Sequence, residues 1–176
     1  MSVPLLLAEA TFLLGLDPHD KLHKKVMGIL KLRKKTYFEL ALSSAAILEV
    51  ANILRSRGYD VGIEHYTYLL EQVEDKYGEI RILPVTGEHI DYALKLLARY
   101  VPKYGRKKVS FHDCVYVATA YIEGYALIVR DYVMKQILEN EGIYYIDLDK
   151  SDDEIYADIT WLSHYEQLPY GMLGND

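Results

Sequence analysis

Four acidic residues stand almost alone within apolar stretches of the sequence: Glu9, Glu49, Asp113 and Asp131. A carboxylate inside a core-forming segment is costly to desolvate, and it persists only where a positive or hydrogen-bonding group meets it. Four such groups in one cleft would repel one another unless a divalent cation neutralised them. Because ligands that offer only oxygen suit Mg²⁺ or Mn²⁺ better than zinc, the expected chemistry is metal-assisted phosphodiester hydrolysis.

Each acid also has an ordinary interpretation when it is taken singly. The segment from Ser110 to Asp113 matches a helix capping box, and Asp131 could cap the next helix. Glu49 could lie on an exposed helix stripe, and Glu9 could end an edge strand. The set as a whole favours a shared site, because Glu49 and Asp113 have few other charges around them and neither lies in a generally solvated segment.

Strand-like and helical segments alternate along the chain. Apolar runs predict strands at 3–7, 37–42, 80–84, 125–129 and 143–148. Periodicity, caps and glycine stops predict helices at 10–16, 21–35, 45–57, 61–76, 86–100 and 110–123, and one from 131 to Gly142. Strands separated by helices imply parallel pairing with right-handed crossovers. The predicted fold is therefore a three-layer α/β/α sandwich with a central, mainly parallel sheet of about five strands.

This architecture brings the four acids together. In open parallel sheets, ligands bind beyond the carboxyl ends of the strands, where the strand order reverses. Glu9 follows the first predicted strand and Asp131 follows the fourth. Glu49 and Asp113 lie about one turn inside helices that could start at the same edge. We therefore expect the four carboxylates to converge there.

Length and charge set the outer limits. A chain of 176 residues that is 51% hydrophobic fits one domain, for which we predict bounds of 1–148, followed by an extension over 149–176. From Asp147 onward there are eight acids against one base, so the acidic excess lies in this extension and does not exclude a nucleic-acid substrate. We expect the extension to pack on the domain or on a partner through its aromatic residues, Trp161, Tyr165 and Tyr170.

Other functional classes lack their sequence signatures. No apolar run approaches the roughly 18 residues that cross a bilayer, and Met1–Leu16 lacks a secretory signal, so we expect a cytoplasmic protein without membrane contact. The phosphate-binding glycine motifs of nucleotide-binding folds and the nucleophile elbow of serine hydrolases are missing. The single cysteine, Cys114, is predicted to pack rather than react.

Basic and histidine-containing segments are secondary candidates. The phosphate-binding candidates are Lys103, Arg106, Lys107, Lys108 and Arg130, for which plain solvated surface is the alternative. The segment from Asp17 to His23 also carries His19 and Asp20, and its spacing could bind a metal. A solvated first helical turn is the favoured interpretation of that segment.

Four segments resemble the four blocks of a PIN domain, in order and at suitable spacing, within a resemblance that covers about residues 3–148. They are 6–14 (LLAEATFLL), 44–54 (SAAILEVANIL), 110–120 (SFHDCVYVATA) and 127–131 (LIVRD). The resemblance implies that Glu9, Glu49, Asp113 and Asp131 are the catalytic, metal-binding acids. It gives Thr11 a supporting place beside the first acid, and Ser110, which starts the third block, is the other supporting candidate.

The same resemblance implies a function and partners. It implies a metal-dependent endoribonuclease that uses Mg²⁺ or Mn²⁺ to cleave RNA. Because the family includes toxins of toxin–antitoxin pairs, it also implies an antitoxin protein and a homodimer as partners. Two departures keep an alternative open: Glu9 stands where the family usually has Asp, and Val129 where it often has a hydroxyl residue. The alternative is a catalytically impaired PIN-like scaffold that binds RNA or a protein partner.

Overall fold

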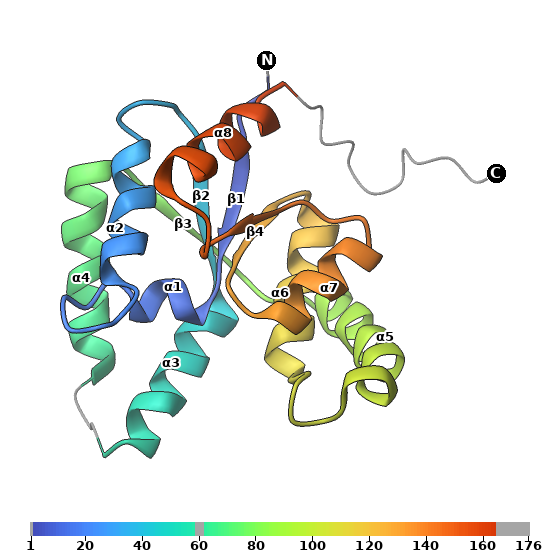
Figure 1. Ribbon diagram of the computed structural model, residues 1–176. Helices are drawn as coiled ribbons and strands as arrows, with labels where there is room; N and C mark the ends of the chain where they lie inside the picture. Colours follow the sequence, from blue (N-terminus) through green and yellow to red (C-terminus); the bar gives the residue numbers. More distant parts are fainter. Residues whose placement is uncertain (1, 59–61, 165–176) are drawn as a thin grey trace.

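The fold is built on one parallel sheet. The computed structural model describes residues 2–58 and 62–164, so Tyr165 and Tyr170 lie outside the described residues (Figure 1). The strands are β1 (Leu5–Ala8), β2 (Glu39–Ser43), β3 (Ile80–Leu83), β4 (Ala126–Val129) and β5 (Tyr145–Asp147). Their order in the sheet is β3-β2-β1-β4-β5, and every neighbouring pair is parallel. The predicted α/β sandwich with a central parallel sheet is confirmed.

The strand order reverses between β1 and β4. The chain moves outward from β1 to β2 and β3, then crosses back to place β4 on the other side of β1, with Leu6 opposite Ala126 and Leu7 opposite Leu127. The carboxyl ends of β1 and β4 therefore lie side by side at the switch point. Ligands bind at this point in open parallel sheets.

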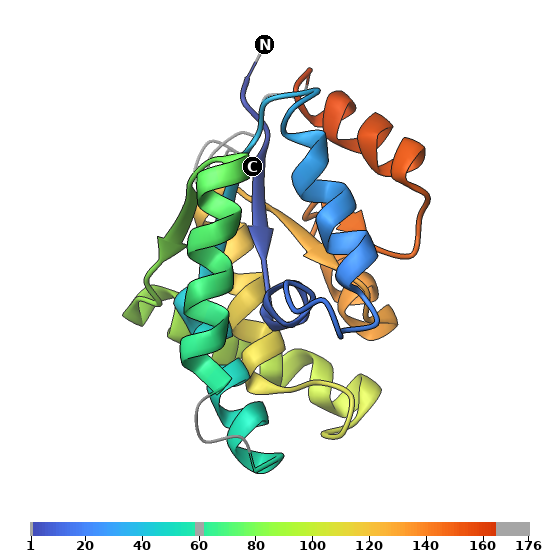
Figure 2. The same cartoon turned by 90° about the vertical axis from the view of Figure 1, so that its left-hand side faces the viewer.

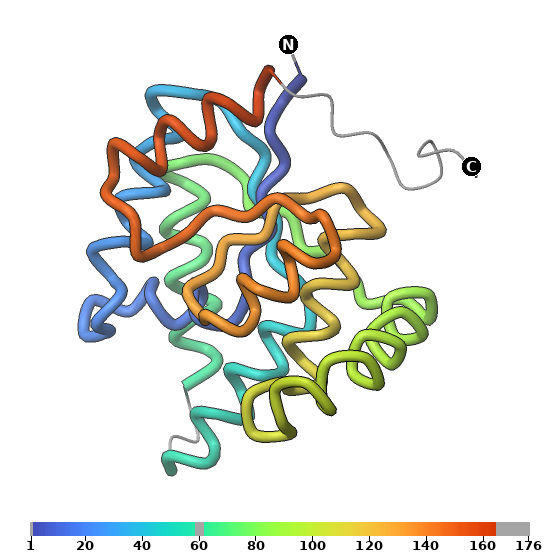
Figure 3. The backbone as a smooth tube through the Cα atoms, turned by 45° about the vertical axis from the view of Figure 1, so that its right-hand side comes forward, coloured from blue at the N-terminus to red at the C-terminus, as the bar shows by residue number. Residues whose placement is uncertain are grey.

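Helices cover both faces of the sheet. The helices within the described residues are α1 (Ala10–Leu14), α2 (His23–Leu32), α3 (Ser44–Ser56), α4 (Gly62–Tyr77), α5 (Gly87–Tyr104), α6 (Phe111–Glu123), α7 (Tyr132–Asn140) and α8 (Asp152–Leu162). Helices α5, α6 and α7 gather on one side and α2, α4 and α8 on the other (Figures 1 and 3). Strands covered on both faces read as continuous apolar runs, and Leu6, Leu7 and all of β4 are accordingly buried. None of these helices is long and apolar enough to span a membrane.

Helix α8 was not predicted from the sequence. It begins with a capping box in which Ser151 and Glu154 exchange hydrogen bonds, and it buries Ile155 and Ile159. It packs against α2 and β5, and the ammonium of Lys25 on α2 donates to the carbonyl oxygen of Lys150 just before α8 (Figure 2). The first part of the predicted extension is thus a helix that covers one side of the sheet.

One buried carboxylate ties α5 to α7. Glu141, which ends α7, is 7% exposed at its side chain and accepts hydrogen bonds from Tyr92, Arg99 and Tyr100 of α5. Although burial would raise the pKa of this carboxyl, these hydrogen bonds lower it overall. The tie matters for the site because α5 leads directly into the loop over 105–110, which carries the basic residues Arg106, Lys107 and Lys108. That loop begins later than expected, since α5 continues to Tyr104.

Candidate functional site

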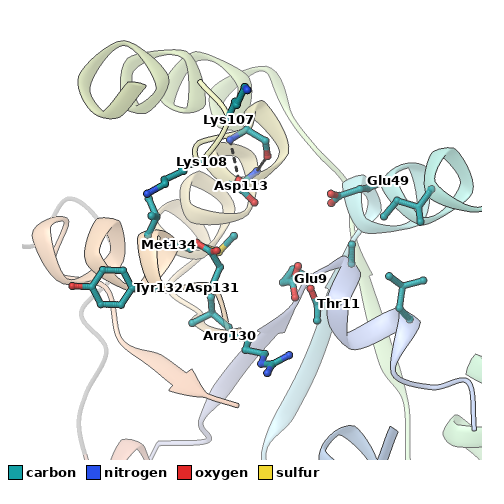
Figure 4. A pocket seen from close by; sticks show the side chains of 16 residues that line it. Glu9, Thr11, Glu49, Lys107, Lys108, Asp113, Arg130, Asp131, Tyr132 and Met134 are labelled. Atoms are coloured by element: carbon teal, nitrogen blue, oxygen red, sulfur yellow. Dashed lines mark hydrogen bonds between the residues drawn. The ribbon is translucent and has the colours of Figure 1, made fainter. Parts of the chain in front are cut away.

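A pocket of about 490 Å³ opens at the carboxyl edge of the sheet, at the switch point. All four predicted acids line it, and they come from four different segments of the chain (Figure 4). The other predicted site residues that line it are Thr11, Lys107, Lys108, Ser110 and Arg130. The structure therefore brings the four acids to one edge of the sheet, as expected.

Glu9 is the deepest of the four acids. It follows β1 directly and starts α1, where its backbone oxygen accepts from the N–H of Phe12 at 3.1 Å. Its residue is only 6% exposed. Burial raises the pKa of its carboxyl to about 7, against the opposing effect of the adjacent Thr11, and the charges of Glu49 and Asp113 raise it further. Figure 4 shows Thr11 beside the Glu9 carboxylate.

Asp113 lies in the first turn of α6 and serves as part of its cap. Its Oδ2 accepts from the backbone N–H of Ser110 at 2.9 Å, and the Ser110 hydroxyl accepts from the N–H of Asp113 at 3.1 Å. The capping interpretation was therefore correct, but it leaves Oδ1 without a hydrogen-bond donor among the described residues. Burial raises the pKa of this carboxyl, opposed by Ser110, and the nearby Glu49 and Asp131 also raise it.

Asp131 combines a cap and a pocket position in the same way. It is the N-cap of α7, and its Oδ1 accepts from the backbone N–H of Met134 at 2.8 Å. The residue is exposed and lines the pocket opposite Glu49 in Figure 4. A cap uses one carboxylate oxygen of each aspartate, so the second oxygen of each is available to a ligand.

Glu49 is held by a residue that sequence reasoning missed. The hydroxyl of Tyr116, on α6, donates a hydrogen bond to Oε2 of Glu49, on α3. Tyr116 is fully buried, so the bond links two helices behind the pocket wall. Burial raises the pKa of the Tyr116 hydroxyl, as does its bond to Glu49, and the hydroxyl therefore keeps the proton that it donates. Its position one turn after Asp113 was the available sequence signal.

The basic candidates separate into three groups. Lys107 and Lys108 line the pocket and are exposed. Arg130 also lines it, but its Nε donates to Oδ1 of Asp149 at 3.0 Å, a partner that the sequence did not reveal. Lys103 and Arg106 do not line the pocket, and the ammonium of Lys103 instead lies 5.1 Å from the ring centre of Tyr104. Lys107 and Lys108 are thus the best placed to meet a phosphate.

The oxygen atoms that line the pocket are ligands of the kind that a hard divalent cation prefers. The pocket offers carboxylate and hydroxyl oxygens, and neither cysteine sulfur nor histidine nitrogen lines it. Burial, and to a lesser degree mutual repulsion, raises the pKa of Glu9 and Asp113, and a bound cation would relieve the repulsion. Within the described residues, however, no three acidic, histidine or cysteine side chains already stand close enough to enclose an ion.

Two other sequence features have structural explanations. Oδ1 of Asp17 accepts from the backbone N–H of His19 at 2.8 Å, and Oδ1 of Asp20 accepts from that of Leu22 at 2.7 Å. The histidine-containing segment is therefore a turn that precedes α2, and not the first helical turn that was expected, since α2 begins at His23. Cys114 is buried, and burial raises the pKa of its thiol to about 12, which excludes a thiolate nucleophile near neutral pH.

Solved structures with the same fold include two prokaryotic proteins. The chain is 18% identical to PAE2754 from Pyrobaculum aerophilum, with a TM-score of 0.54 over 88% of this chain and 90% of that one. It is 16% identical to VapC20 of Mycobacterium tuberculosis, described as a sarcin–ricin loop cleaving toxin, with a TM-score of 0.51 over 68% of this chain and 84% of that one. At this level of identity, the likeness concerns the fold. No curated protein matches the sequence significantly.

A family model decides the classification. The model of the PIN domain matches residues 12–140, which is well over half of the chain. The matched region contains Glu49, Asp113 and Asp131, while Glu9 lies just before its start. With this match, the parallel sheet and the acids at its switch point, the chain belongs to the PIN domain family.

Proposed function

We propose that this protein is a metal-dependent endoribonuclease that hydrolyses RNA phosphodiester bonds. The observation that carries the proposal is the meeting of four carboxylates from four chain segments in one pocket at the strand switch point. Membership of the PIN family supports it, because nucleases of this family generally use divalent metal ions. The choice between Mg²⁺ and Mn²⁺ belongs to the proposal.

The acids, two lysines and two hydroxyl residues of the pocket have roles in this mechanism. Glu9, Glu49, Asp113 and Asp131 would hold the cation, the two aspartates through the oxygens that their caps leave available. When bound, a divalent cation lowers the pKa of a water and stabilises charge on the phosphate. Lys107 and Lys108 neutralise the phosphate of the RNA from the pocket rim, and Thr11 orients the Glu9 carboxylate. Ser110 fixes Asp113 through its capping box.

The likeness to VapC20, a toxin that cleaves the sarcin–ricin loop, supports a narrower proposal. In this proposal the protein is the toxin of a toxin–antitoxin pair, acts in the cytoplasm, forms a homodimer and binds an antitoxin protein. A small DNA-binding protein encoded by the neighbouring reading frame would support this. Co-expression of that protein with this one should then suppress RNA cleavage. Undiminished cleavage would contradict the toxin assignment.

The nuclease proposal is tested by RNA cleavage with added Mn²⁺. We expect the wild type to cleave generic RNA and Asp113→Asn to lose at least about a hundredfold in rate, because charge stabilisation by a catalytic group is typically of that order. Asparagine keeps an oxygen that can accept from Ser110, so the α6 cap survives. The matched control is Asp91→Asn, an exposed aspartate of α5 outside the pocket. Equal residual activity in wild type and Asp113→Asn would reject the proposal.

A second candidate function is a catalytically impaired scaffold that binds RNA or a protein. Its basis is Glu9, which is buried with a pKa of about 7 and is therefore partly protonated at neutral pH. Metal titration followed by thermal unfolding separates the two candidates, since a ligand of the native state raises its stability. No shift at millimolar Mn²⁺ would favour the scaffold. Cleavage that appears only in Glu9→Asp would show that the longer side chain is what impairs it.

A further inference from the structure

Tyr132 is an exposed aromatic residue at the mouth of the pocket. It is the first residue of α7, lines the pocket and is 71% exposed. Figure 4 places it at the rim on the same side as Lys108, with Asp131 between it and Glu9. The next two residues, Val133 and Met134, are buried. The backbone that carries the ring is therefore fixed while the ring itself stands in solvent.

The ring has no partner within the part of the chain that the structure describes. No other ring stacks on Tyr132 there, and its hydroxyl makes no hydrogen bond. Two exposed aromatic residues elsewhere, Tyr144 and Trp161, contact each other instead. A single exposed tyrosine is ordinary on a protein surface. This one differs because it shares a pocket with four carboxylates and two lysines.

Stacking on a nucleobase fits this position. Aromatic side chains stack on bases of any sequence, and a positive groove beside them tracks the phosphates. Lys107 and Lys108 supply the positive charge. Because Tyr132 follows Asp131 directly and consecutive Cα atoms are about 3.8 Å apart, a base on Tyr132 belongs to a nucleotide close to the phosphate that a cation held by Asp131 would contact. A base inside a duplex is already stacked on both faces and cannot use the ring.

We infer that Tyr132 stacks on an unpaired base of the RNA substrate beside the scissile phosphate. The inference rests on the proposed nuclease function and deepens it. It makes Tyr132 a substrate-binding residue that selects for an unpaired nucleotide. Any base can occupy the ring, so this contact selects strand state and not sequence.

The test uses a short single-stranded RNA that carries 2-aminopurine at successive positions. Binding is measured with Asp113→Asn as the background, so that the RNA stays intact. We expect stacking to quench the fluorophore at one position. Adding Tyr132→Ala should remove this quenching and weaken binding by about tenfold or more, which is the usual effect of losing one base–aromatic stack. Adding Tyr132→Phe should preserve both, because the ring is kept.

Two comparisons make the test specific. The control variant is Tyr37→Ala, since Tyr37 is 70% exposed but lies outside this pocket, and it should bind RNA as the background does. The control RNA lacks the base at the quenched position. It should bind the background protein about as weakly as the intact RNA binds the Tyr132→Ala protein, and Tyr132→Ala should not weaken it further. A blunt duplex of the same sequence should bind more weakly than the single strand.

The possible failures are distinguishable. Equal affinity and equal quenching in the background and Tyr132→Ala proteins would overturn the stacking role while leaving the nuclease proposal standing. Preference for the duplex would also overturn the stacking role, because a paired base cannot use the ring. If neither the wild type nor any variant binds or cleaves RNA, the proposed function falls and the role of Tyr132 falls with it.

Discussion

Burial controls the protonation of Glu9 in the metal-free protein. The residue is only 6% exposed, so its carboxyl has little access to water, and its pKa rises from 4.5 to about 7. Between these two pH values the folded state keeps a proton that the unfolded state has released. The free energy of unfolding therefore falls as the pH rises through this window, and above it the charged carboxylate remains a cost.

This cost predicts the effect of Glu9→Gln on stability. Glutamine cannot ionise, so the variant should lose the decrease in unfolding free energy between pH 4.5 and about 7. At about pH 8 in the presence of a chelator, it should be more stable than the wild type by up to about 3 kcal/mol, the equivalent of the pKa shift. Urea unfolding across the pH range measures both effects.

The control for this prediction is Glu71→Gln, an exposed glutamate on α4. Its stability should follow the wild-type pH dependence. Parallel curves for Glu9→Gln and the wild type would contradict the prediction and mean that Glu9 is solvated. Adding Mn²⁺ at pH 8 should reverse the order, because only the wild type has the carboxylate that the proposed site uses.

At the scale of single residues, the sequence revealed the acids but not the two tyrosines beside them, Tyr116 and Tyr132. An isolated carboxylate in an apolar segment is anomalous, so Glu49 and Asp113 could be recognised from their surroundings alone. Tyr116 and Tyr132 were not anomalous, since tyrosine occurs both in cores and on surfaces. Only the packing of α6 behind α3, and the exposure at the start of α7, distinguishes them. The pairing of Arg130 with Asp149 depends on a loop conformation that no sequence pattern fixes.

At the scale of elements, hydrophobic periodicity predicted the sheet and the helices that position the site. It failed for α8 because the acidic composition of the extension hid a helix. The signals were nevertheless present: Ser151 and Glu154 form a capping box, and Ile155, Ile159 and Leu162 recur at helical spacing. The helix predicted over 86–100 also ended too early, because α5 runs through Pro102 to Tyr104.

The tie between α5 and α7 predicts the effect of a single substitution. Glu141→Ala leaves the hydroxyls of Tyr92 and Tyr100 without the acceptor that they share. Removing one member of a buried hydrogen-bonded charge network should lower the free energy of unfolding by about 2–4 kcal/mol. Urea unfolding at neutral pH measures this loss.

Two variants calibrate that measurement. Tyr92→Phe removes one hydrogen bond and keeps the ring that stacks on Tyr121 at 4.8 Å, so it should cost only about 1 kcal/mol. Glu71→Ala, on an exposed face of α4, should be nearly neutral. A loss in Glu141→Ala no larger than that in Glu71→Ala would show that the network does not hold α5 in place.

At the scale of the whole molecule, the acidic residues that set the net charge and the basic residues that could bind RNA lie in different places. The chain carries a formal charge of −6, which disfavours non-specific association with RNA. Much of the acidic excess lies in the extension after β5. Asp149 of this extension also accepts a hydrogen bond from Arg130, so that this cation is already paired. Phosphate binding therefore depends on the few cations that line the pocket, chiefly Lys107 and Lys108.

This charge distribution predicts that RNA affinity depends only weakly on salt concentration, and that the dependence comes from the lysines of the pocket. Each lysine that neutralises a phosphate of single-stranded RNA adds about 0.7 to the slope of log affinity against log salt concentration. Replacing Lys107 and Lys108 with alanine in the Asp113→Asn background should therefore reduce the slope by about 1.4, measured between about 50 and 200 mM salt. Replacing Lys103 and Arg106, which belong to the same chain segment but do not line the pocket, removes the same charge and should leave the slope unchanged. Equal reductions in both double variants would mean that overall charge, and not the pocket, attracts the RNA.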